Sequence, residues 1–470
     1  MPKQTEKGQI AILLAAAMVL LLAMMALAID GGMIYSDRRY DQNVADSSAL
    51  AGGAAAAMIM ETNEYAYNDF SCSDELITDM TTGARARAIE YAVTRADVNL
   101  FTDFDADVSD KHGVEVVCED GDANNDGRPD SPIADKYLRI HVWVTQVVDT
   151  SFVHFFYDGD VTNVVDAVVE VRPRRPIAYG NAVVALSTDC DNSMEFKGVG
   201  SSGPIEIFGG NLVTNGCYNI SGNTEVIVDD LPGQNLNPGV YYYDPNASGT
   251  NKWGFTSPYP EPMTELIPTD EVEEPDCSGL PDFSAPSLSN TSEPLEPGNY
   301  PSLDVPNHVT VYLKSGLYCF DGNVDVGGHL KTFDKDPDDG AAYAATDLVN
   351  GVTLFLKNGD FTIQNSNSLV DIHAPLGIQA NVTPALKGMV LFSSYNNTDG
   401  IIDLSGGSNG GFDGTVFAPT SHVDIGGNSD LLGNCQVIAY SVTGHGTDKV
   451  TVNYVDNELF MIPNYIDLME

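Results

Sequence analysis

Residues Ile10 to Ile29 read IAILLAAAMVLLLAMMALAI, an apolar run without charge, glycine or proline. A helix of this length rises about 30 Å, the thickness of a bilayer's hydrocarbon core. Lys3 and Lys7 precede the run and predict a cytoplasmic N-terminus. We therefore expect a single-pass anchor in the cell membrane, with lipid as its partner and the bulk of the chain exported.

Three alternatives for proteolytic processing of the N-terminus are compatible with these residues. Ala26-Leu27-Ala28 is a small-residue site at which a secretory signal peptide could be cut. A short pilin-type leader ending at Gly8 would leave Gln9 as the new N-terminus. In the third alternative nothing is removed, residues 1–9 form a cytoplasmic leader, and the helix stays as an anchor. We expect the helix to be retained because it continues into helix-compatible sequence over residues 10–60.

The residues around and after the apolar run carry an ordered motif. It comprises Gly8-Gln9-Ile10-Ala11, the run itself, and then Asp30-x-Gly32-x-x-Tyr35-x-x-Arg38-Arg39-x-x-Gln42-x-x-Ala45-Asp46-x-x-Ala49-Leu50-Ala51. This segment resembles the N-terminal domain of TadE/TadG-like proteins, components of the tight-adherence (Flp) pilus machinery that are related in layout to type IV pilins. The resemblance covers roughly the first sixty residues. It implies a role in pilus assembly, surface anchoring or adhesion, with pilus-assembly or pilin-like partners bound through the N-terminal helix.

One position departs from the pilin pattern. Pilins that the prepilin peptidase processes usually carry Glu at the fifth position after the cleavage glycine, where this chain has Leu13. Both leader cleavage after Gly8 and assembly as a major pilin therefore stay open. Small residues also recur at helical spacing beyond the run, at Ala45, Ala49, Gly52 or Gly53, and Ala56. Such a stripe lets another helix approach closely, either from a partner or from this protein's own globular part.

Composition narrows the function further. The formal net charge is −45, and all ten arginines lie between Arg38 and Arg175. A general nucleic-acid binder needs clustered Lys and Arg to neutralise phosphates, so we expect no nucleic-acid partner. A highly acidic surface is typical of a well-hydrated exported protein.

The seven cysteines form no C-x-x-C pair, which argues against a zinc ribbon or a thioredoxin-like site. Disulfides are permitted if the body of the chain is exported. Pairing neighbours along the sequence would join Cys72 to Cys118, Cys190 to Cys217 and Cys277 to Cys319, and would leave Cys435 over. Buried, unpaired thiols are the alternative.

Residues 61–176 have the pattern of a small α+β domain. A second helix is expected from Thr81 to about Val98, and strands are expected at Val114–Cys118, Tyr137–Thr145 and Val161–Val171. A long N-terminal helix packed on an antiparallel sheet is pilin-like in element order.

Between the first two of these strands lies a candidate calcium loop. Its oxygen donors occupy positions 1, 3, 5 and 9, Gly127 allows a sharp turn at position 6, and position 7 would offer a backbone carbonyl. We predict bound Ca²⁺ with the ligands Asp122, Asn124, Asp126, Arg128 and Asp130. The same residue types are common in plain turns, which is the alternative.

Beyond Arg175 the composition changes to Gly, Asn, Ser and short β-branched runs. We expect a β-rich domain to begin at 177–230, a Pro-rich acidic linker or insertion at 231–308, a β-helix-like domain at 309–456, and a C-terminal tail or cap at 457–470. Short strands with polar corners predict a right-handed parallel β-helix, with a β-sandwich as the alternative. The segment Gly414–Asn428 also resembles β-helical segments of other pilus-associated envelope proteins.

Some β-helix proteins cleave polysaccharides, and such activity requires catalytic groups on the strands. No arginine follows Arg175, which disfavours a lyase of the pectate type, and the eight histidines are dispersed. Acidic residues recur on the predicted strands at Asp360, Asp371, Asp403 and Asp424, as an inner hydrolase site would require. Acidic residues are frequent throughout, and we therefore expect no enzymatic activity. A secreted or anchored β-helix that binds or cleaves polysaccharide is the alternative.

Overall fold

The computed structural model describes residues 9–63, 65–78, 83–99, 101, 111–121, 131, 133–153, 159–191, 193–198, 203–232, 238–243, 255, 258–263, 265–269, 272–290, 293–333, 351–364, 367–376, 385–404, 411–426, 432–446, 450–455 and 459–469. The chain divides into two compact units. The first, here the stem unit, comprises Met1–Asp122, Asp135–Arg174 and Pro463–Glu470. The second, here the β unit, comprises Ala123–Ala134 and Arg175–Ile462.

The apolar run forms the first part of α1, a single helix over Gln9–Thr62. The second half of α1 packs along α3, Ala84–Val98, which matches the helix expected from Thr81. Every fourth residue of α3 is a buried alanine, so α3 presents a narrow small-residue face: Ala84, Ala88, Ala92 and Ala96. A short helix, α2 at Glu75–Thr78, precedes α3.

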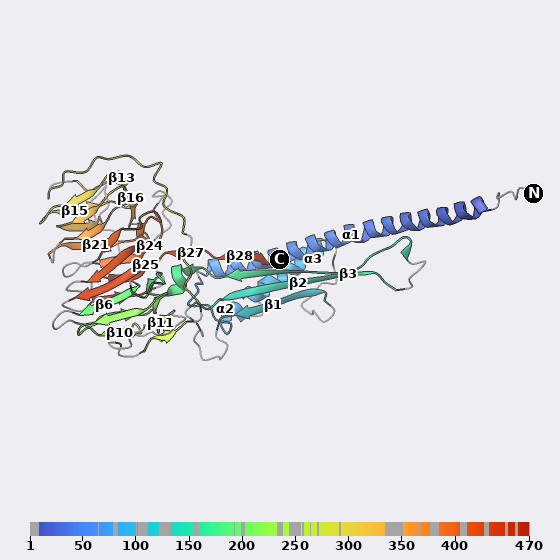
Figure 1. Ribbon diagram of the computed structural model, residues 1–470, viewed down its shortest axis with the longest axis horizontal. Coiled ribbons are helices and arrows are strands. Elements are labelled where there is room, and N and C mark those ends of the chain that lie inside the picture. Colours follow the sequence, from blue (N-terminus) through green and yellow to red (C-terminus); the bar gives the residue numbers. More distant parts are fainter. Residues whose placement is uncertain are drawn as a thin grey trace, which may run out of the picture. The chain divides into compact units, whose positions relative to one another are not determined.

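Four antiparallel strands form the sheet of the stem unit, in the order β1-β2-β3-β28 (Figure 1). The first three agree with the predicted strands, and their bounds are Gly113–Glu119, Tyr137–Val147 and Thr162–Arg172. In β2 buried and less buried residues alternate over most of the strand, as expected of a strand with one face on a core. The sequence did not reveal β28, Tyr465–Met469, which pairs with β3.

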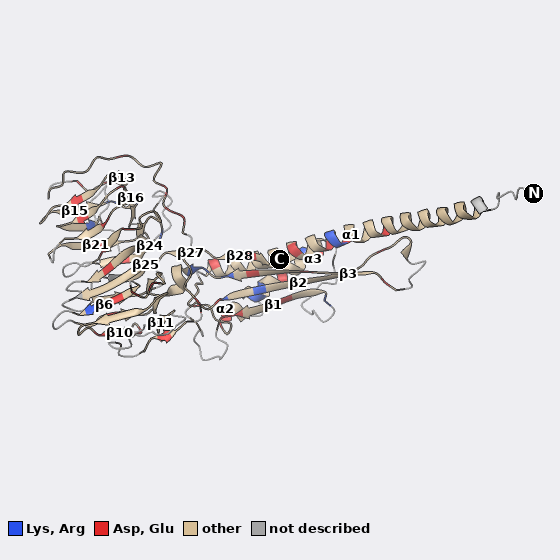
Figure 2. Cartoon of the chain, in the orientation of Figure 1, with Lys and Arg blue, Asp and Glu red and all other residues tan. Residues whose placement is uncertain are grey.

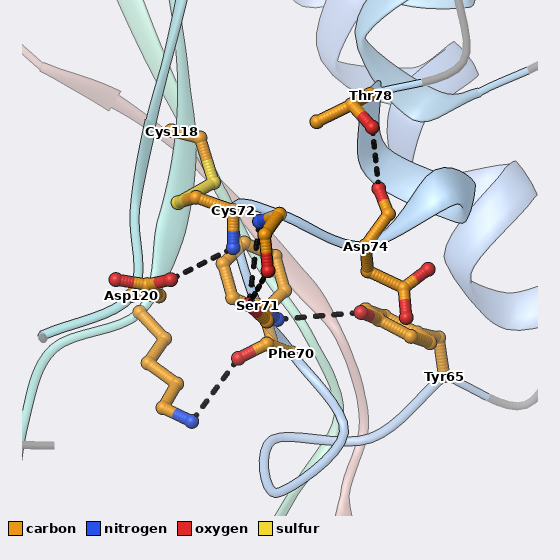
Figure 3. The surroundings of a disulfide bond; sticks show 10 residues. Tyr65, Phe70, Ser71, Cys72, Asp74, Thr78, Cys118 and Asp120 are labelled. Atoms are coloured by element: carbon orange, nitrogen blue, oxygen red, sulfur yellow. Dashed lines mark hydrogen bonds between the residues drawn. A yellow bond between two sulfur atoms is a disulfide. The ribbon is translucent and has the colours of Figure 1, made fainter. Parts of the chain in front are cut away.

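A disulfide between Cys72 and Cys118 ties the segment after α1 to strand β1 (Figure 3). Beside it, the backbone N–H of Cys72 donates a 2.8 Å hydrogen bond to the carboxylate of Asp120. The buried ammonium of Lys136 donates to the carbonyls of Tyr67 and Phe70 at 2.9 and 3.2 Å. The disulfide and these bonds hold the loop between α1 and α2 against the end of the sheet.

The β unit contains a 22-stranded sheet, β5 to β26. Its first strands are β5 Val183–Ala185, β6 Met194–Gly198, β7 Ile205–Phe208, β8 Leu212–Thr214, β9 Tyr218–Ser221, β10 Val226–Asp229, β11 Val240–Tyr242 and β12 Glu261–Pro262. The later ones are β13 Gly298–Tyr300, β14 Leu303–Val305, β15 Thr310–Leu313, β16 Gly316–Phe320, β17 Val324–Val326, β18 His329–Thr332, β19 Val352–Leu356, β20 Phe361–Ile363, β21 Leu369–His373, β22 Met389–Ser393, β23 Ile401–Asp403, β24 Gly411–Gly426, β25 Leu432–Gly446 and β26 Val450–Asn453.

Many strands of the β unit pair in parallel with the strand three places along the chain, as β13 does with β16 and β16 with β19. The same spacing joins β14 to β17 and β15 to β18. Described pairings within this sheet are parallel, whereas a β-sandwich is built from antiparallel sheets. The finding therefore favours the parallel arrangement over the sandwich alternative.

One register column shows how the sequence fills the core of the β unit. Apolar residues stand opposite one another from strand to strand and belong to one buried cluster: Tyr318, Leu354, Leu391, Val416, Val437, Val183, Leu212 and Val240. The adjacent column points to the other face of the same strands and includes Phe355, Phe392 and Phe417, whose rings contact one another edge to face. Both faces of this part of the sheet are therefore buried.

Part of the Pro-rich acidic segment covers that outer face. Ile267 is buried there and exchanges two 2.8 Å hydrogen bonds with the side chain of Asn215, from β8's C-terminal end. Further along, Cys277 forms a disulfide with Cys319 of β16. The segment over 231–308 thus contributes β11 to β14 and a strap across the strands, in addition to connecting them.

The order of strands in space differs from the order in sequence. The strands β5 to β11 come first in the sequence, and β13 to β25 follow. The late strand β25 pairs with the early strands β5 and β6, so the two groups of strands adjoin at this point. Beside this point β4, Arg175–Pro176, pairs with β27, Met461–Ile462. Entry and exit of the β unit therefore lie side by side, and the chain then supplies β28 to the sheet of the stem unit.

All three disulfides join the cysteines that are neighbours in sequence, which confirms the predicted pairing. The third of them links Cys190 to Cys217. Cys435 is a free and buried thiol.

Candidate functional site

The segment with the specific sequence motif is α1, and its two halves have different surroundings. From Ile12 to Ile29 almost every side chain is exposed, Leu13 by 73%. In Figure 2 this part of the helix carries no charged residue. Among the described residues, it is the one helix long and apolar enough to cross a membrane. Exposed apolar surface of this extent is typical of a segment that lies in lipid or against a partner.

Contact with the rest of the stem unit begins at the residue after the apolar run. Asp30 is buried, with 1% of its surface exposed, and its carboxylate accepts hydrogen bonds from three successive backbone N–H groups. The donors are Ser151 at 2.8 Å, Phe152 at 2.9 Å and Val153 at 2.6 Å. These residues belong to the connection between β2 and β3. Asp30 therefore fixes the β2–β3 connection to α1.

A second buried carboxylate lies three helical turns further along. Asp41 accepts a 3.2 Å hydrogen bond from Nδ2 of Asn163 on β3, while its Oδ1 has no hydrogen-bond partner among the described residues. Burial raises the pKa of Asp41, and the nearby carboxylate of Asp37 adds to the rise, whereas the bond from Asn163 opposes it. The environment of Asp41 therefore disfavours its ionised form, although the bond from Asn163 favours it.

Two further polar side chains of α1 fix its register on the sheet and on α3. The Nε2 of Gln42 donates to the carbonyl of Asp166 on β3 at 2.9 Å and to Oδ1 of Asp46 at 2.8 Å. The hydroxyl of Tyr40 donates to the carbonyl of Asn99 at the end of α3, at 3.0 Å.

The small-residue stripe of α1 packs inside the stem unit. Ala45, Ala49 and Ala56 are buried. A Cβ on Gly52 would come within 2.8 Å of the carbonyl oxygen of Ala88 on α3, and one on Gly53 within 2.7 Å of Val169. The sequence left two alternatives for what packs on this stripe, a partner helix or the protein's own globular part. In the structure, α3 and the sheet of the stem unit pack on it. A partner would have to use other faces of α1.

Several motif residues remain on the surface of α1. Tyr35, Arg38 and Arg39 are exposed, and the guanidinium of Arg39 stacks over the ring of Tyr35 with 5.9 Å to its centroid. These residues follow the apolar run by two to three turns and contribute no buried contact to the stem unit. They are motif positions that the fold leaves on the surface, as it also does Gly32 and Leu50.

The candidate calcium ligands Asp122, Asn124, Asp126, Arg128 and Asp130 lie outside the described residues. Within the described part of the chain, no group of three or more His, Cys, Asp or Glu side chains is arranged to hold a metal ion. The calcium site stays a prediction.

The four acidic residues considered for catalysis occupy different environments. Asp403 and Asp424 stand opposite each other on β23 and β24. Asp424 also pairs with Nδ1 of His445 at 3.0 Å, whereas Asp371 pairs with Lys331 at 3.2 Å. Asp360 accepts a hydrogen bond from the backbone of Ile401 at 2.8 Å. The structure therefore brings two of the four together and gives the others structural partners.

The sequence did not single out the buried contacts of Asp30, Asp41 and Asn163. A signal was present for Asp30, since it is the first polar residue after twenty apolar ones. Asn163 carried none, because an isolated Asn in a strand gives no local pattern.

Comparison with known proteins gives one match. Residues 8–57 match a family model described as putative Flp pilus-assembly TadE/G-like. The match ends within α1, so it covers the exposed apolar half and most of the packed half. No curated protein and no solved structure matches the chain.

Proposed function

We propose that this protein, whose residues 8–57 are TadE/G-like, is a membrane-anchored, exported envelope component of the tight-adherence (Flp) pilus system. Its role would be pilus assembly, surface anchoring or adhesion. The observation that carries the proposal is the division of α1: Ile12–Ile29 is apolar and exposed, whereas the same helix is packed from Asp30 onward. A bilayer would cover the first half and leave the second half as the support of the stem unit.

The direction of insertion that we propose is N-terminus cytoplasmic and body exported. Lys3 and Lys7 on one side of the apolar run support it by the positive-inside rule. The three disulfides support it independently, since they occur in both units beyond the helix and disulfides persist in oxidising compartments.

The partners that we propose are membrane lipid along Ile12–Ile29 and a pilus-assembly or pilin-like protein at the exposed motif positions. Tyr35, Arg38 and Arg39 support the second assignment because they are in the matched segment, are exposed, and serve no buried contact. No nucleic-acid partner is proposed for a chain of net charge −45.

For the β unit we propose an exported right-handed parallel β-helix. Pairing between strands three places apart, as in β13–β16, β14–β17 and β15–β18, supports coils of three strands, and parallel crossovers are almost always right-handed. We also propose Ca²⁺ binding at Asp122–Asp130. Calorimetric titration with calcium tests this: heat that disappears in Asp126→Ala supports it, and the absence of heat at millimolar calcium contradicts it.

We propose that the protein acts without catalysis. One observation favours the alternative of polysaccharide cleavage, namely the juxtaposition of Asp403 and Asp424, since neighbouring parallel strands lie about 4.8 Å apart and retaining glycosidases use closely spaced carboxylates. Asp371→Asn and Asp424→Asn should leave surface attachment intact. Release of sugar by the native protein that either substitution abolishes would support the alternative.

The membrane-anchoring proposal is tested by placing carboxylates in the apolar half of α1. Leu21→Asp combined with Leu22→Asp should move the protein out of the membrane fraction and abolish pilus-dependent attachment, because each Asp costs roughly 3 kcal/mol at the centre of a membrane helix. Met58→Asp is the matched control, since Met58 is exposed to a similar degree on the same helix but outside the run. Attachment that survives the double substitution would contradict the proposal.

A further inference from the structure

The three hydrogen bonds from Ser151, Phe152 and Val153 to Asp30, here called the clamp, lie next to the end of the apolar run. Asp30 directly follows Ile29, the last residue of the apolar run. It accepts hydrogen bonds from the backbones of Ser151, Phe152 and Val153, and the hydroxyl of Ser151 lies 3.8 Å from the sulfur of Met33 on the next turn of α1. These contacts place the connection beside the turn at which the helix leaves the apolar run.

The position of that turn determines how deep the bonded segment lies relative to the bilayer. A helix rises 1.5 Å per residue, so a group bonded to the residue after Ile29 lies within a few ångströms of the end of the hydrocarbon-spanning segment. The depth corresponds to the interfacial layer of a bilayer, where headgroups and acyl chains meet. Ser151–Val153 therefore lie at the level of the lipid headgroups when Ile10–Ile29 is in the membrane.

The side chain presented at this level is aromatic. Phe152 is 37% exposed although its backbone is held by the buried carboxylate of Asp30. Phenylalanine, like Trp and Leu, is one of the side chains that interfacial segments bury at the boundary between headgroups and acyl chains. Asp149, three residues earlier, is exposed and limits how deeply the connection can enter.

We propose that the Ser151–Val153 segment is a second membrane contact, which rests on the bilayer interface beside the helix that spans it. The inference rests on the proposed membrane anchoring of α1. A single helix leaves its attached domain free to tilt, and a second contact offset from the helix restrains that tilt. Asp30 is then a positioning residue that holds the contact at its depth.

Nitroxide quenching in vesicles tests this inference on the full-length, oxidised protein. A single added cysteine carries a fluorophore in each of three variants: Phe152→Cys, Val117→Cys and Leu22→Cys. Background labelling is suppressed because six native cysteines are in disulfides and Cys435 is buried. Val117 is the matched control, since it is 41% exposed and pairs with Arg139, near the end of β2 remote from the connection.

Phosphatidylcholine vesicles carry the nitroxide either near the headgroup or deep in the acyl chain. We expect the Phe152 label to be quenched by the headgroup nitroxide roughly threefold more than the Val117 label, and to be shielded from aqueous iodide. The Leu22 label should be quenched most by the deep nitroxide. Adding Asp30→Ala to the Phe152 variant should reduce its quenching, because the clamp is lost.

Two results would overturn the inference in different ways. If the Leu22 label is quenched while the Phe152 label behaves as the Val117 label does, the anchor stands and the second contact is wrong; Phe152 then faces water or another protein. If the Leu22 label is not quenched by either lipid, the proposed anchoring fails, and the second contact fails with it.

Discussion

Gly53 of α1 lies so close to Val169 of β3 that a Cβ at the glycine would stand 2.7 Å from Cγ1 of the valine. No real Cβ contact is that short, so the helix rests on the sheet at a position where only hydrogen fits. The second half of the TadE/G-like helix is thereby a structural element of the stem unit. The first half, free of such contacts, is the part available to a membrane.

Gly53→Ala should destabilise the stem unit by about 2 kcal/mol, because the added methyl group overpacks a filled contact. Gly31→Ala is the matched control on the same helix, since no atom lies within 4 Å of its Cβ position. The control should be neutral or stabilise the helix by roughly 0.5–1 kcal/mol. Chemical denaturation in detergent measures both, and equal effects at the two glycines would contradict the packing.

Asp30→Ala should loosen the β2–β3 connection. Three backbone N–H groups lose a charged acceptor, and the expected cost is about 2 kcal/mol. Hydrogen exchange followed by mass spectrometry should show faster exchange at Ser151 to Val153 and unchanged exchange in the middle of β2. Uniformly faster exchange across the stem unit would instead indicate global unfolding.

The buried Asp41 makes stability depend on pH. Burial raises its pKa above the ordinary value of 3.8, so the folded protein binds the proton more tightly than the unfolded chain. The resulting stabilisation is complete below 3.8 and is lost as the pH rises through the folded-state pKa. Asp41→Asn keeps a side chain that can bond to Asn163 and removes the charge.

We therefore expect Asp41→Asn to unfold at a higher temperature than the native protein at pH 7, with the difference shrinking as the pH falls toward 3.8. Thermal unfolding at several pH values measures it. Asp46→Asn is a suitable control, because Asp46 is less buried on the same helix. A difference that does not change with pH would contradict the account.

The Cys72–Cys118 disulfide spans 46 residues and should contribute about 4 kcal/mol by restricting the unfolded chain. Replacing both cysteines by alanine should lower the stability of the stem unit by that order. In the same double variant, reductant should no longer change the stability of the stem unit. In Cys435→Ala, reductant should lower that stability as it does in the native protein, since Cys435 is a free thiol. An unchanged unfolding midpoint in the double variant would show that the bond contributes nothing.

Local patterns of the sequence predicted the elements that depend on local physics. The apolar run, the helix at Ala84–Val98 and the strands β1 to β3 were visible because residue periodicity reports which face is buried. Neighbour pairing of the cysteines also agreed with the structure. The parallel pairing of β13 with β16 fits the predicted coils, although their handedness stays a proposal.

Long-range pairings could not be read from local patterns. The contact of Val437 on β25 with Val183 on β5 joins residues more than half the chain apart, and neither strand carries a sign of its partner. The strand β28 looked like a tail because its residues alternate only weakly, and its pairing with β3 fixes it. The sequence predicts short strands in this region, whereas β24 is one continuous strand that pairs with β25 on both sides of a register shift between Ala418 and His422.

For the candidate site, the motif located the right helix but not the role of each residue. The buried carboxylates bind the β2–β3 connection and β3, more than a hundred residues away in sequence, so their contacts could not be foreseen. The calcium loop, Asp122–Asp130, lies outside the described residues and stays a prediction.

The mass of the native protein's N-terminal peptide tests the central claim most directly, because the account requires the apolar half of α1 to remain attached. Purification from the membrane fraction and mass spectrometry should give an N-terminus at Met1 or Pro2, for an uncleaved anchor, or at Gln9, for a processed pilin-like subunit. Both retain Ile10–Ile29. An N-terminus at Ile29, with the protein free in the medium, would contradict the account.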